Sequence, residues 1–267
     1  MRAVLAEAAM AFRGVPGVEV LDEGDLVRSF APGLPQPYLN TIARLDVPAA
    51  AFPDRVVAVE APYRKARVPT SWWLDDTSRP ADAAATLAAL GVPEAGGEAV
   101  MALDLEPMPE AVRVAEVAAA AAGIEVAAVH RIEDLEAWIG AVAGAYGWVD
   151  AARAALMRTL YDPRTPHGAD PRRIQVVARI GGTAVGAASL FAAAGQGWVT
   201  NVGTIPAARG RGVGAALTAA CLRISEARGE PSAWLAASAM GEPVYARLGF
   251  RTVGRVTHHA GGGALRP

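Results

Sequence analysis

Apolar residues in the last part of the chain recur with spacings that predict alternating strands and helices. Residues 197–205 are rich in Val, Thr and Trp, which is typical of a strand, and Pro206 ends that run. From 213 to 228 the spacing becomes helical and gives one apolar stripe. The stripe contains Val213, Leu217, Cys221 and Ile224. The other elements predicted here are a strand at 233–238, a helix at 241–248 and a strand at 250–257.

The preceding segment continues this alternation. A strand is predicted at Glu125–His130, followed by two helices between Ile132 and Leu160 and a polar loop at 158–171. Residues 174–180 and 183–191 are predicted to form the two strands of a hairpin. Gly181-Gly182, a favoured tight-turn pair, joins them. From residue 124 the predicted order is therefore strand, two helices, three strands, helix, strand, helix and strand.

The first part of the chain has its own pattern. Strand-like runs lie at 18–21, 38–45, 71–74 and 99–105, and helix-like runs lie near 49–64 and 81–90. The segment Glu106-Pro107-Met108-Pro109 is a natural boundary, and an alanine-rich stretch follows it. A chain of 267 residues suits two ordinary domains. We therefore expect an α/β domain at 1–107, a linker at 108–123 and a second domain at 124–267.

The most informative motif is Arg209-Gly210-Arg211-Gly212-Val213-Gly214, between the predicted strand and helix. A glycine-rich turn that opens a helix is an anion site, because its N–H groups lack intrahelical partners and the helix dipole adds partial positive charge. Glycines permit unusual backbone angles and leave no Cβ in the way of a phosphate. The two arginines could add charge-assisted contacts.

Other interpretations of this motif fit less well. A P-loop needs Gly-Lys-Ser/Thr, and the chain's single lysine is Lys65. A dinucleotide fingerprint has the spacing Gly-x-Gly-x-x-Gly, whereas this loop reads Gly-x-Gly-x-Gly. A flexible loop without a ligand remains the alternative.

Composition limits the classes of function. Hydrophobic residues make up 52% and charged residues 19%, enough for a large core, and no apolar run reaches the length of a membrane span. A net charge of −2 gives no reason to expect nucleic-acid binding. The apolar run after Met1 is interrupted by Glu7, so no signal peptide is predicted and a cytoplasmic protein without membrane contact is expected.

Cysteine and histidine usage predicts no metal site. Cys221 is the single cysteine, which excludes an internal disulfide, and it falls on the apolar stripe of the 213–228 helix. The histidines are dispersed, and the adjacent pair on the last predicted strand faces opposite ways. They are His130, His167, His258 and His259.

Two motifs together resemble the GCN5-related N-acetyltransferases, the GNAT superfamily. Its acetyl-CoA loop reads Gln/Arg-x-x-Gly-x-Gly/Ala, which Arg209-x-x-Gly212-x-Gly214 matches, with Thr204-Ile205-Pro206 at the expected distance before it. About 30 residues later the superfamily has a short helix that carries Tyr and ends Leu-Gly-Phe, as in residues 245–250. The resemblance covers roughly residues 124–259, and the predicted element order is the superfamily's order.

The first domain resembles the superfamily only loosely. The residues concerned are Asn40, the Trp72-Trp73 pair, Arg79-Pro80 and Leu90-Gly91, and they are similar to the degenerate GNAT-like domain of some two-domain bacterial acetyltransferases. The alternative is an unrelated α/β cap. Trp72 and Trp73 favour core or interface packing over a ligand box, because adjacent strand residues point to opposite faces.

The resemblance implies an α/β GNAT fold around a mixed, mostly antiparallel sheet. It implies that acetyl-CoA is the cosubstrate and a primary amine of a small molecule or peptide the acceptor, attacked directly in a ternary complex. The implied cofactor-binding residues lie on the strand before the loop, in the loop and after the next strand. They are Val202, Gly203, Thr204, Arg209, Gly210, Arg211, Gly212, Val213, Gly214, Ala215 and Ser238.

Tyr245 takes the position of the general acid in related enzymes. A tyrosine pKa of about 10 and a thiol pKa of about 8.5 allow a tyrosine to protonate the departing thiolate without large tuning. A core tyrosine is the structural alternative. In relatives the acceptor groove is shaped by the first two helices, near which Tyr146, Trp148 and Tyr161 lie here, and these aromatics fit a core equally well.

One departure from the family pattern concerns the general base. Many relatives carry a glutamate on the strand before the loop, but residues 198–204 contain no carboxylate and no histidine. A water chain ordered by Thr200 or Asn201, a residue elsewhere, or an acceptor of low amine pKa would fill that role. The alternative function is a non-catalytic acyl-CoA-binding sensor or partner-binding module. The sequence leaves a homodimer open.

Overall fold

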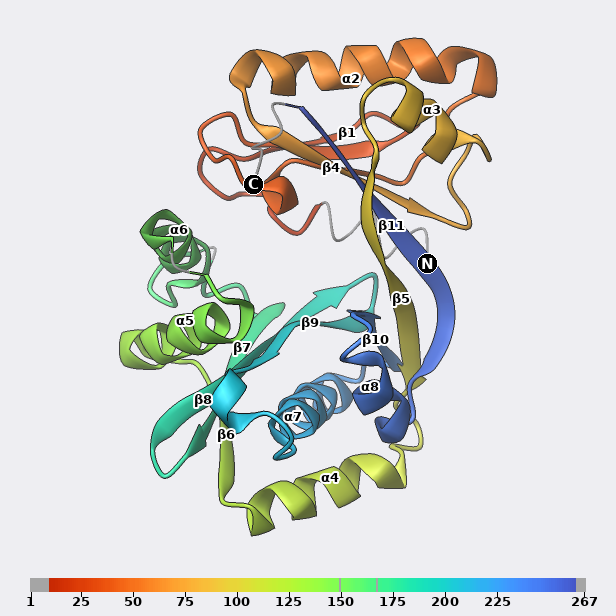
Figure 1. Cartoon of the computed structure of the whole chain (residues 1–267). Helices are drawn as coiled ribbons and strands as arrows, with labels where there is room; N and C mark the ends of the chain where they lie inside the picture. Colours follow the sequence, from red (N-terminus) through yellow and green to blue (C-terminus); the bar gives the residue numbers. More distant parts are fainter. Residues whose placement is uncertain (1–9, 149, 167, 263–267) are drawn as a thin grey trace. The chain divides into compact units, whose positions relative to one another are not determined.

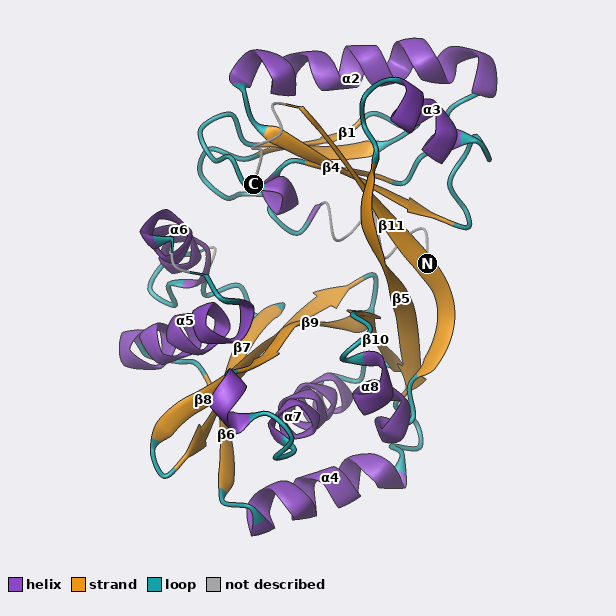
Figure 2. Cartoon of the chain, viewed as in Figure 1, coloured by secondary structure: helices purple, strands orange, loops and turns teal. Residues whose placement is uncertain are grey.

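The structure is a computed structural model that describes residues 10–148, 150–166 and 168–262. The N-terminal run interrupted by Glu7, and His167, lie outside the described residues. The chain divides into two compact units (Figures 1 and 2). Unit 1 contains Met1–Ala99 and Gly254–Pro267, and unit 2 contains Val100–Val253. Strands β5 (Glu94–Asp104) and β11 (Arg251–Gly262) each contribute residues to both units.

Unit 1 is a sheet with the strand order β1-β2-β3-β4-β11, and the long helix α2 lies across one face of it (Figure 1). Its pairs are antiparallel except for β3 with β4. The strands are β1 (Glu19–Asp22), β2 (Val27–Phe30), β3 (Thr41–Ala43) and β4 (Pro69–Asp75). The helices are α2 (Phe52–Ala66) and α3 (Ala83–Ala89), with 3-10 turns at Pro37–Leu39 and Ala49–Ala51.

The core of unit 1 forms around Trp72, whose side chain is fully buried between the sheet and α2. Its indole Nε1 donates to Glu60 of α2 at 2.7 Å, and Thr70 Oγ1 donates to the same carboxyl oxygen at 2.7 Å. The backbone N–H of Gly262 donates to the other oxygen of Glu60 at 2.5 Å, which fixes the end of β11. Trp73 faces the other side and packs edge-on against His258 at 4.9 Å, so the two tryptophans point to opposite faces as predicted.

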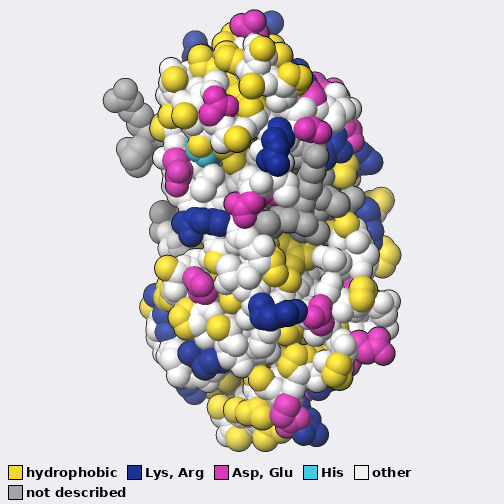
Figure 3. Space-filling model, turned by 90° about the vertical axis from the view of Figure 1, so that its right-hand side faces the viewer, with side chains coloured by type: hydrophobic (Ala, Val, Ile, Leu, Met, Phe, Trp, Pro, Cys, Tyr) yellow, Lys and Arg dark blue, Asp and Glu magenta, His cyan; other side chains and the backbone are white. Residues whose placement is uncertain are grey.

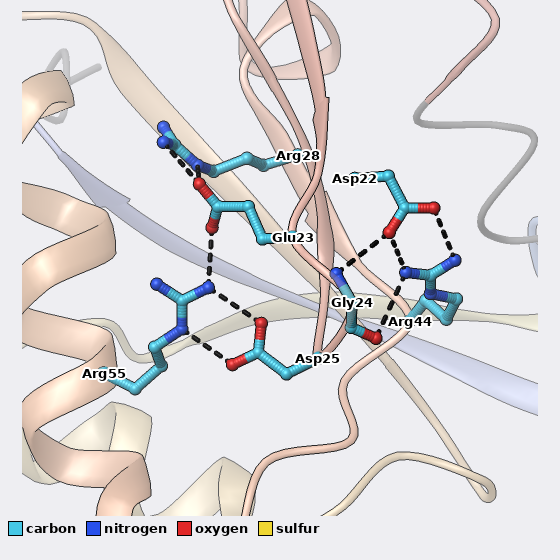
Figure 4. Close-up of polar contacts among 7 residues, drawn as sticks. All are labelled: Asp22, Glu23, Gly24, Asp25, Arg28, Arg44 and Arg55. Atoms are coloured by element: carbon cyan, nitrogen blue, oxygen red, sulfur yellow. Dashed lines mark hydrogen bonds and ion pairs between the residues drawn. The ribbon is translucent and has the colours of Figure 1, made fainter.

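A network of surface charges ties the β1–β2 turn of unit 1 to α2 and β3 (Figure 4). Arg55 of α2 donates to Asp25 at 2.8 Å and to Glu23 at 2.6 Å, and Arg44 binds Asp22. The hydrogen bonds from Arg55 hold the pKa of Asp25 below its ordinary value. Because these groups stay partly exposed, the network contributes little stability and serves mainly to fix the turn.

Unit 2 is a sheet with the strand order β5-β10-β9-β8-β7-β6. The pairs from β6 to β9 are antiparallel, and β9 with β10 is parallel. The strands are β6 (Ile124–Ala128), β7 (Arg173–Ile180), β8 (Thr183–Ala193), β9 (Gln196–Thr204) and β10 (Ser232–Ala237). The helices are α4 (Glu110–Ala121), α5 (Ile132–Tyr146), α6 (Ala151–Tyr161), α7 (Val213–Ala227) and α8 (Glu242–Leu248), with a 3-10 turn at Pro206–Ala208.

Two glycines show how closely the helices approach this sheet. A Cβ on Gly186 of β8 would lie 2.6 Å from Val213 Cγ1, so α7 packs directly on one face. A Cβ on Gly203 of β9 would lie 2.7 Å from the Cβ of Ala145, so α5 packs on the other face.

Cys221 of α7 is fully buried, and burial raises the pKa of its thiol to about 12.

The mixed, mostly antiparallel sheet and the element order predicted from residue 124 onward are confirmed. The deviations are local. Strand β2 escaped prediction because its apolar residues Val27 and Phe30 are separated by two polar ones and do not alternate. The run at 38–45 is a 3-10 turn followed by a three-residue strand, α6 continues through Tyr161 where a loop was expected, and β11 runs to Gly262.

The compact units divide the chain differently from the predicted domains 1–107, 108–123 and 124–267, which stay a prediction. Residues 110–121, expected as a linker, form helix α4, and Glu116 of α4 accepts from Arg223 of α7 at 2.9 Å. Its alanines favour a helix.

The outer side of α4 is apolar. Val114 is 58% exposed and Val117 is 66% exposed. Hydrophobic side chains gather at the lower end of the molecule in Figure 3, over α4.

Candidate functional site

The glycine loop forms the predicted turn between β9 and α7. Gly212 caps the N-terminus of α7 with φ +87° and Gly210 has φ +75°, both in the left-handed region that favours glycine. A Cβ built on either glycine would meet no atom within 4 Å. Both glycines therefore lie at an exposed turn, where the described residues leave the position of a side chain uncovered.

The first turn of α7 begins with N–H groups that have no acceptor inside the helix. The helical hydrogen bonds begin with the N–H of Ala216, which donates to Gly212 O at 3.0 Å. The N–H groups of Val213, Gly214 and Ala215 precede it and have no partners inside the helix. The side chain of Val213 is buried and Gly214 has no side chain, so this turn would contact a ligand through its backbone N–H groups. Such a turn fits an anionic group.

The side chain of Arg209 hydrogen-bonds to backbone carbonyl groups. Its Nη2 donates to Ala145 O at the end of α5 at 3.1 Å, and its Nε donates to Thr204 O at 3.3 Å. The side chain thus ties the loop to α5 and β9, an arrangement that its place in the motif did not predict. Arg211 is exposed on the loop. Contacts of these arginines with phosphate stay a prediction.

Strand β9 is irregular where the site residues lie. Ser189 pairs with Thr200 and Ala187 with Gly203, so Asn201 and Val202 together oppose Ala188 in a β-bulge. Asn201 has φ +54° at this bulge. β9 and β10 are in register at Gly197–Ala233 and Trp198–Trp234, and the described residues beyond these form no further registered pairs. The backbone of 202–204 therefore lies where β9 has left its parallel neighbour.

Thr204 and Gly214 lie side by side, since a Cβ on Gly214 would be 4.0 Å from Thr204 Oγ1. The end of β9 and the first turn of α7 are thereby brought together. The hydroxyl of Tyr146 donates to Val202 O at 3.2 Å, which joins the end of α5 to the bulge.

Ser238 and Tyr245 form a second group, around Gly241. The N–H of Gly241 donates to Ser238 Oγ at 3.3 Å, so Ser238 also caps the turn that starts α8. A Cβ on Gly241 would lie 2.8 Å from Tyr245 Cε2 and 3.5 Å from Ser238 Oγ, so the tyrosine ring and the exposed serine both lie close to Gly241. Tyr245 is 8% exposed and packs against Phe250, with ring centroids 6.0 Å apart.

The aromatic residues of α5 and α6 separate into two places. Tyr146 stacks on Trp148 at 5.4 Å, and the guanidinium carbon of Arg153 lies 4.6 Å from the Trp148 ring. Tyr161 packs edge-on against Trp138 at 5.2 Å. A pocket of about 180 Å³ opens between the two helices. Its lining is Ile139, Ala143, Trp148, Asp150, Ala151, Ala154 and Met157.

A row of polar side chains crosses β7, β8 and β9 beside the bulge, and sequence reasoning missed most of it. Gln175, Ser189 and Thr200 are register partners, and Asn201 Nδ2 donates to Ser189 Oγ at 3.3 Å. Tyr161 also hydrogen-bonds Asn201. Burial raises the pKa of the Tyr161 hydroxyl. Polar residues at alternate positions of an otherwise apolar strand, as in Arg173-Ile-Gln175, are the signal that could have found it.

Within the described ranges, no three His, Cys, Asp or Glu side chains are grouped closely enough to hold a metal ion. Among the helices that the structure describes, none combines the length and the apolar character needed to cross a membrane.

Comparison with known proteins identifies the family of this site. Residues 130–253 match the family model described as an acetyltransferase (GNAT) domain. The chain therefore contains a GNAT domain, which comprises β9, the glycine loop, α7 and α8. The family and the fold support an acyl-transfer function. No curated protein sequence gives a significant match.

Solved structures share the fold over the whole chain. A GCN5-related N-acetyltransferase from Kribbella flavida is 22% identical, with a TM-score of 0.71 and coverage of 98% of this chain and 97% of that one. One from Sphaerobacter thermophilus is 21% identical, with a TM-score of 0.63 and coverage of 99% and 90%. A tandem GNAT protein from the clavulanic acid biosynthesis pathway is 16% identical, with a TM-score of 0.58 and coverage of 100% and 94%. That tandem fold supports the resemblance of the first part to a degenerate GNAT-like domain.

Proposed function

We propose that this protein is an acetyltransferase that moves the acetyl group of acetyl-CoA to a primary amine of a small molecule or peptide. The observation that carries the proposal is the open glycine loop, whose unsatisfied N–H groups begin α7 inside a GNAT domain. The loop residues 210–215 would hold the pyrophosphate through backbone N–H groups. Val202, Gly203 and Thr204 would meet the pantetheine arm, with Ser238 as a further polar contact.

The proposed reaction is a direct attack in a ternary complex. The neutral amine nitrogen attacks the thioester carbon, the carbon–sulfur bond breaks, and Tyr245 gives its phenolic proton to the departing thiolate. The ring of Tyr245 is buried and packs against Phe250, with ring centroids 6.0 Å apart, which would limit its movement before substrate binds. A fixed acid is what such a step needs.

The amine must lose a proton, and β9 has no side chain that would take it as a carboxylate or imidazole. We propose that water removes this proton, ordered by Thr200 and Asn201. Both side chains are half-buried at the bulge, directly before the proposed pantetheine contacts.

The test is the release of free CoA from acetyl-CoA over a panel of amines, with longer acyl-CoAs alongside. Turnover with at least one amine, and formation of the acetylated amine, is the expected result. Tight acetyl-CoA binding without turnover on any amine would instead favour a non-catalytic acyl-CoA-binding sensor, the alternative that the missing β9 carboxylate supports.

We further expect one acetyl-CoA per chain, bound by residues 124–259. Within the described residues of unit 1, the helix α2 begins after the sequence Pro48-Ala-Ala-Ala, without a glycine loop. Isothermal titration calorimetry measures the stoichiometry, and two sites per chain would contradict the expectation. Cytoplasmic location and a homodimer stay predictions, to be tested by cell fractionation and light scattering.

A further inference from the structure

Helices α5 and α6 are neighbours in unit 2 (Figure 1), and the pocket between them has a volume of about 180 Å³. Alanines line it from both sides, with Ala143 on α5 and Ala151 and Ala154 on α6. These side chains are too short to fill the space between the helices. A cavity of about 150 Å³ with apolar walls is large enough to bind benzene. The pocket therefore has room for an apolar ring or a short branched chain.

The lining of this pocket is apolar except for one carboxylate. Ile139 and Met157 are both buried and contribute the larger aliphatic surfaces, and Trp148 contributes an aromatic wall. Asp150 is the one charged side chain among the lining residues that the structure describes. Such a lining favours an apolar group, and it contains no cation that would hold a carboxylate.

The aromatic wall is packed by two residues that do not belong to the lining. The ring of Tyr146 stacks on Trp148, with centroids 5.4 Å apart and 22° between the ring planes. The guanidinium carbon of Arg153 lies 4.6 Å from the centroid of the Trp148 ring. These contacts would limit the movement of Trp148, so that little ordering of the wall is needed when a ligand binds.

Asp150 gives the pocket its charge. One of its carboxylate oxygens accepts from the N–H of Ala152 at 2.8 Å, which caps the start of α6. The side chain is exposed, so the carboxylate lies at the rim of the pocket, and it forms no ion pair with any described residue. A carboxylate at the rim attracts a protonated amine that approaches and repels an acceptor that carries a carboxylate of its own.

Tyr146 connects the pocket to the proposed transfer site. Its ring stacks on Trp148, and its hydroxyl donates to Val202 O at 3.2 Å. A Cβ on Gly203 would lie 3.2 Å from Tyr146 Cε2, so the same ring lies against the strand that carries the proposed pantetheine contacts. The stacked pair of Tyr146 and Trp148 thus separates the pocket from the β9 bulge. An acceptor with one end in the pocket needs a spacer that passes this pair to bring its amine to the bulge.

We propose that this pocket binds the apolar body of the acceptor, and that the acceptors are arylalkylamines or branched alkylamines without a carboxylate. The inference rests on the proposed acetyltransferase function and narrows its class of acceptor. Amino acids and amino sugars are poor acceptors in this view. Burial of their carboxylate or hydroxyl groups against an apolar lining would leave most of those groups without a hydrogen-bond partner.

The first test measures kcat/KM of the wild-type protein over matched amines. In a series of n-alkylamines, kcat/KM should rise about 4-fold for each methylene group until the pocket is full. Phenylalkylamines should reach an optimum at an intermediate spacer length. There they should exceed the ω-amino acid of the same spacer, and glucosamine, by at least about 10-fold. An ω-amino acid or glucosamine that equals the best phenylalkylamine would overturn the proposal.

The second test fills the pocket and compares Ala154→Phe with Ala155→Phe. Ala154 is half-buried in the lining, whereas Ala155 is the next residue of the same helix, is exposed and does not line the pocket. Ala154→Phe should lower kcat/KM for the best phenylalkylamine by at least about 10-fold and leave that for ethylamine within about 2-fold. Ala155→Phe should leave both values unchanged.

A smaller substitution covers the case in which Ala154→Phe does not fold. Ala151→Leu adds a branched chain to the rim of the pocket, and it should shift the optimum toward smaller amines. Unchanged phenylalkylamine kinetics in a folded Ala154→Phe protein, or in Ala151→Leu where that variant replaces it, would contradict the role of the pocket.

A binding readout separates this inference from the proposed function. Binding of a phenylalkylamine to the acetyl-CoA-free protein, followed by ligand-observed NMR, should weaken in Ala154→Phe and not in Ala155→Phe. Equal turnover of phenylalkylamines and amino acids would overturn the inference and leave the acetyltransferase standing. Binding that depends on Ala154, without turnover of any amine, would instead remove the proposed function and leave the pocket as a binding site.

Discussion

Unit 1 contains a group of buried polar side chains with internal partners, whereas the proposed site of unit 2 lies at an exposed turn. In unit 1, Tyr63 is fully buried and donates to Ser29 O at 2.8 Å, and Glu60 is fully buried with three donors. Asn40, also fully buried, accepts from Ala31 N–H at 2.8 Å and donates to Leu34 O and Gln36 O at 3.0 Å. In unit 2, the glycine loop before α7 is exposed at Gly210, Arg211 and Gly212, and the first N–H groups of α7 have no acceptor inside the helix.

Polar groups can thus stabilise the fold in one unit and form a ligand site in the other. A polar group whose partners lie inside the fold stabilises that fold, since leaving it unmatched would be costly. A donor that the fold leaves without an internal partner is available to a ligand. We therefore expect substitutions in the buried polar group of unit 1 to change stability, and substitutions in the proposed site of unit 2 to change binding or turnover.

The largest expected effect is the loss of acetyl-CoA binding in Gly212→Asp. The new carboxylate would enter the proposed anion site, and a Cβ would be forced into the left-handed backbone at φ +87°. Calorimetry on the folded variant measures the affinity. Unchanged affinity would remove the loop from the site.

Gly91→Asp in unit 1 is the control. Gly91 has φ +82° and, like Gly212, open space at the position of a Cβ. The substitution should therefore cost a similar backbone strain, about 1–2 kcal/mol, without touching acetyl-CoA affinity.

Tyr245→Phe should lower kcat by roughly 10²–10⁴-fold while acetyl-CoA affinity changes little. The ring and its packing on Phe250 remain, and only the hydroxyl that would protonate the thiolate is removed. The loss should appear in kcat more than in KM, because the proton is needed only as the thiolate departs. A near-normal kcat would make Tyr245 a packing residue and leave water as the acid.

Glu60→Ala should lower the free energy of unfolding by about 3 kcal/mol or more, because it leaves buried donors of Thr70 and Trp72 without an acceptor. Acetyl-CoA affinity, measured below the unfolding transition, should stay unchanged. Glu116→Ala, which breaks a partly exposed ion pair with Arg223, should cost less than about 1 kcal/mol. Calorimetric unfolding that ranks the two variants equally would undo the contrast between the units.

Tyr63→Phe has a smaller expected effect than Glu60→Ala, and its effect depends on pH. Burial raises the pKa of Tyr63 to about 12 from an ordinary value of about 10. The neutral phenol is favoured in the fold, so its contribution is fully present below pH 10 and is lost as pH rises through 12. In the wild type this loss should reach about 2 kcal/mol, and Tyr63→Phe should lack that part of the alkaline decline. Urea unfolding between pH 8 and 12 measures both.

The sequence predicted the fold of unit 2 because its signals are local. The apolar stripe of α7, the turn at Gly181-Gly182 and the motif ending at Phe250 each depend on nearby residues. The opening of the glycine loop was also predictable, since Gly210 and Gly212 mark left-handed positions. Strand β2 was not predictable in this way, because Val27 and Phe30 do not alternate with its polar residues.

Features that depend on distant partners could not be predicted. The hydrogen bond from Arg209 to Ala145 O joins residues 64 positions apart, and nothing in the motif indicates it. The polar row needs the register of β7, β8 and β9, together with the bulge at Asn201, before its members meet. Pairing between distant strands is decided by the whole fold rather than by any one stretch of chain.

The strand β11 has a consequence for the order in which the molecule is completed during synthesis. It registers with β4 from Asp75–Val256 to Pro69–Gly262, and Glu60 holds its end. The ribosome releases the first residues of unit 1 long before this strand, so that unit waits with an open edge while all of unit 2 emerges. The part of the protein that is made first is therefore the part that finishes folding last, and its unpaired β4 edge is the surface that a nascent chain must protect.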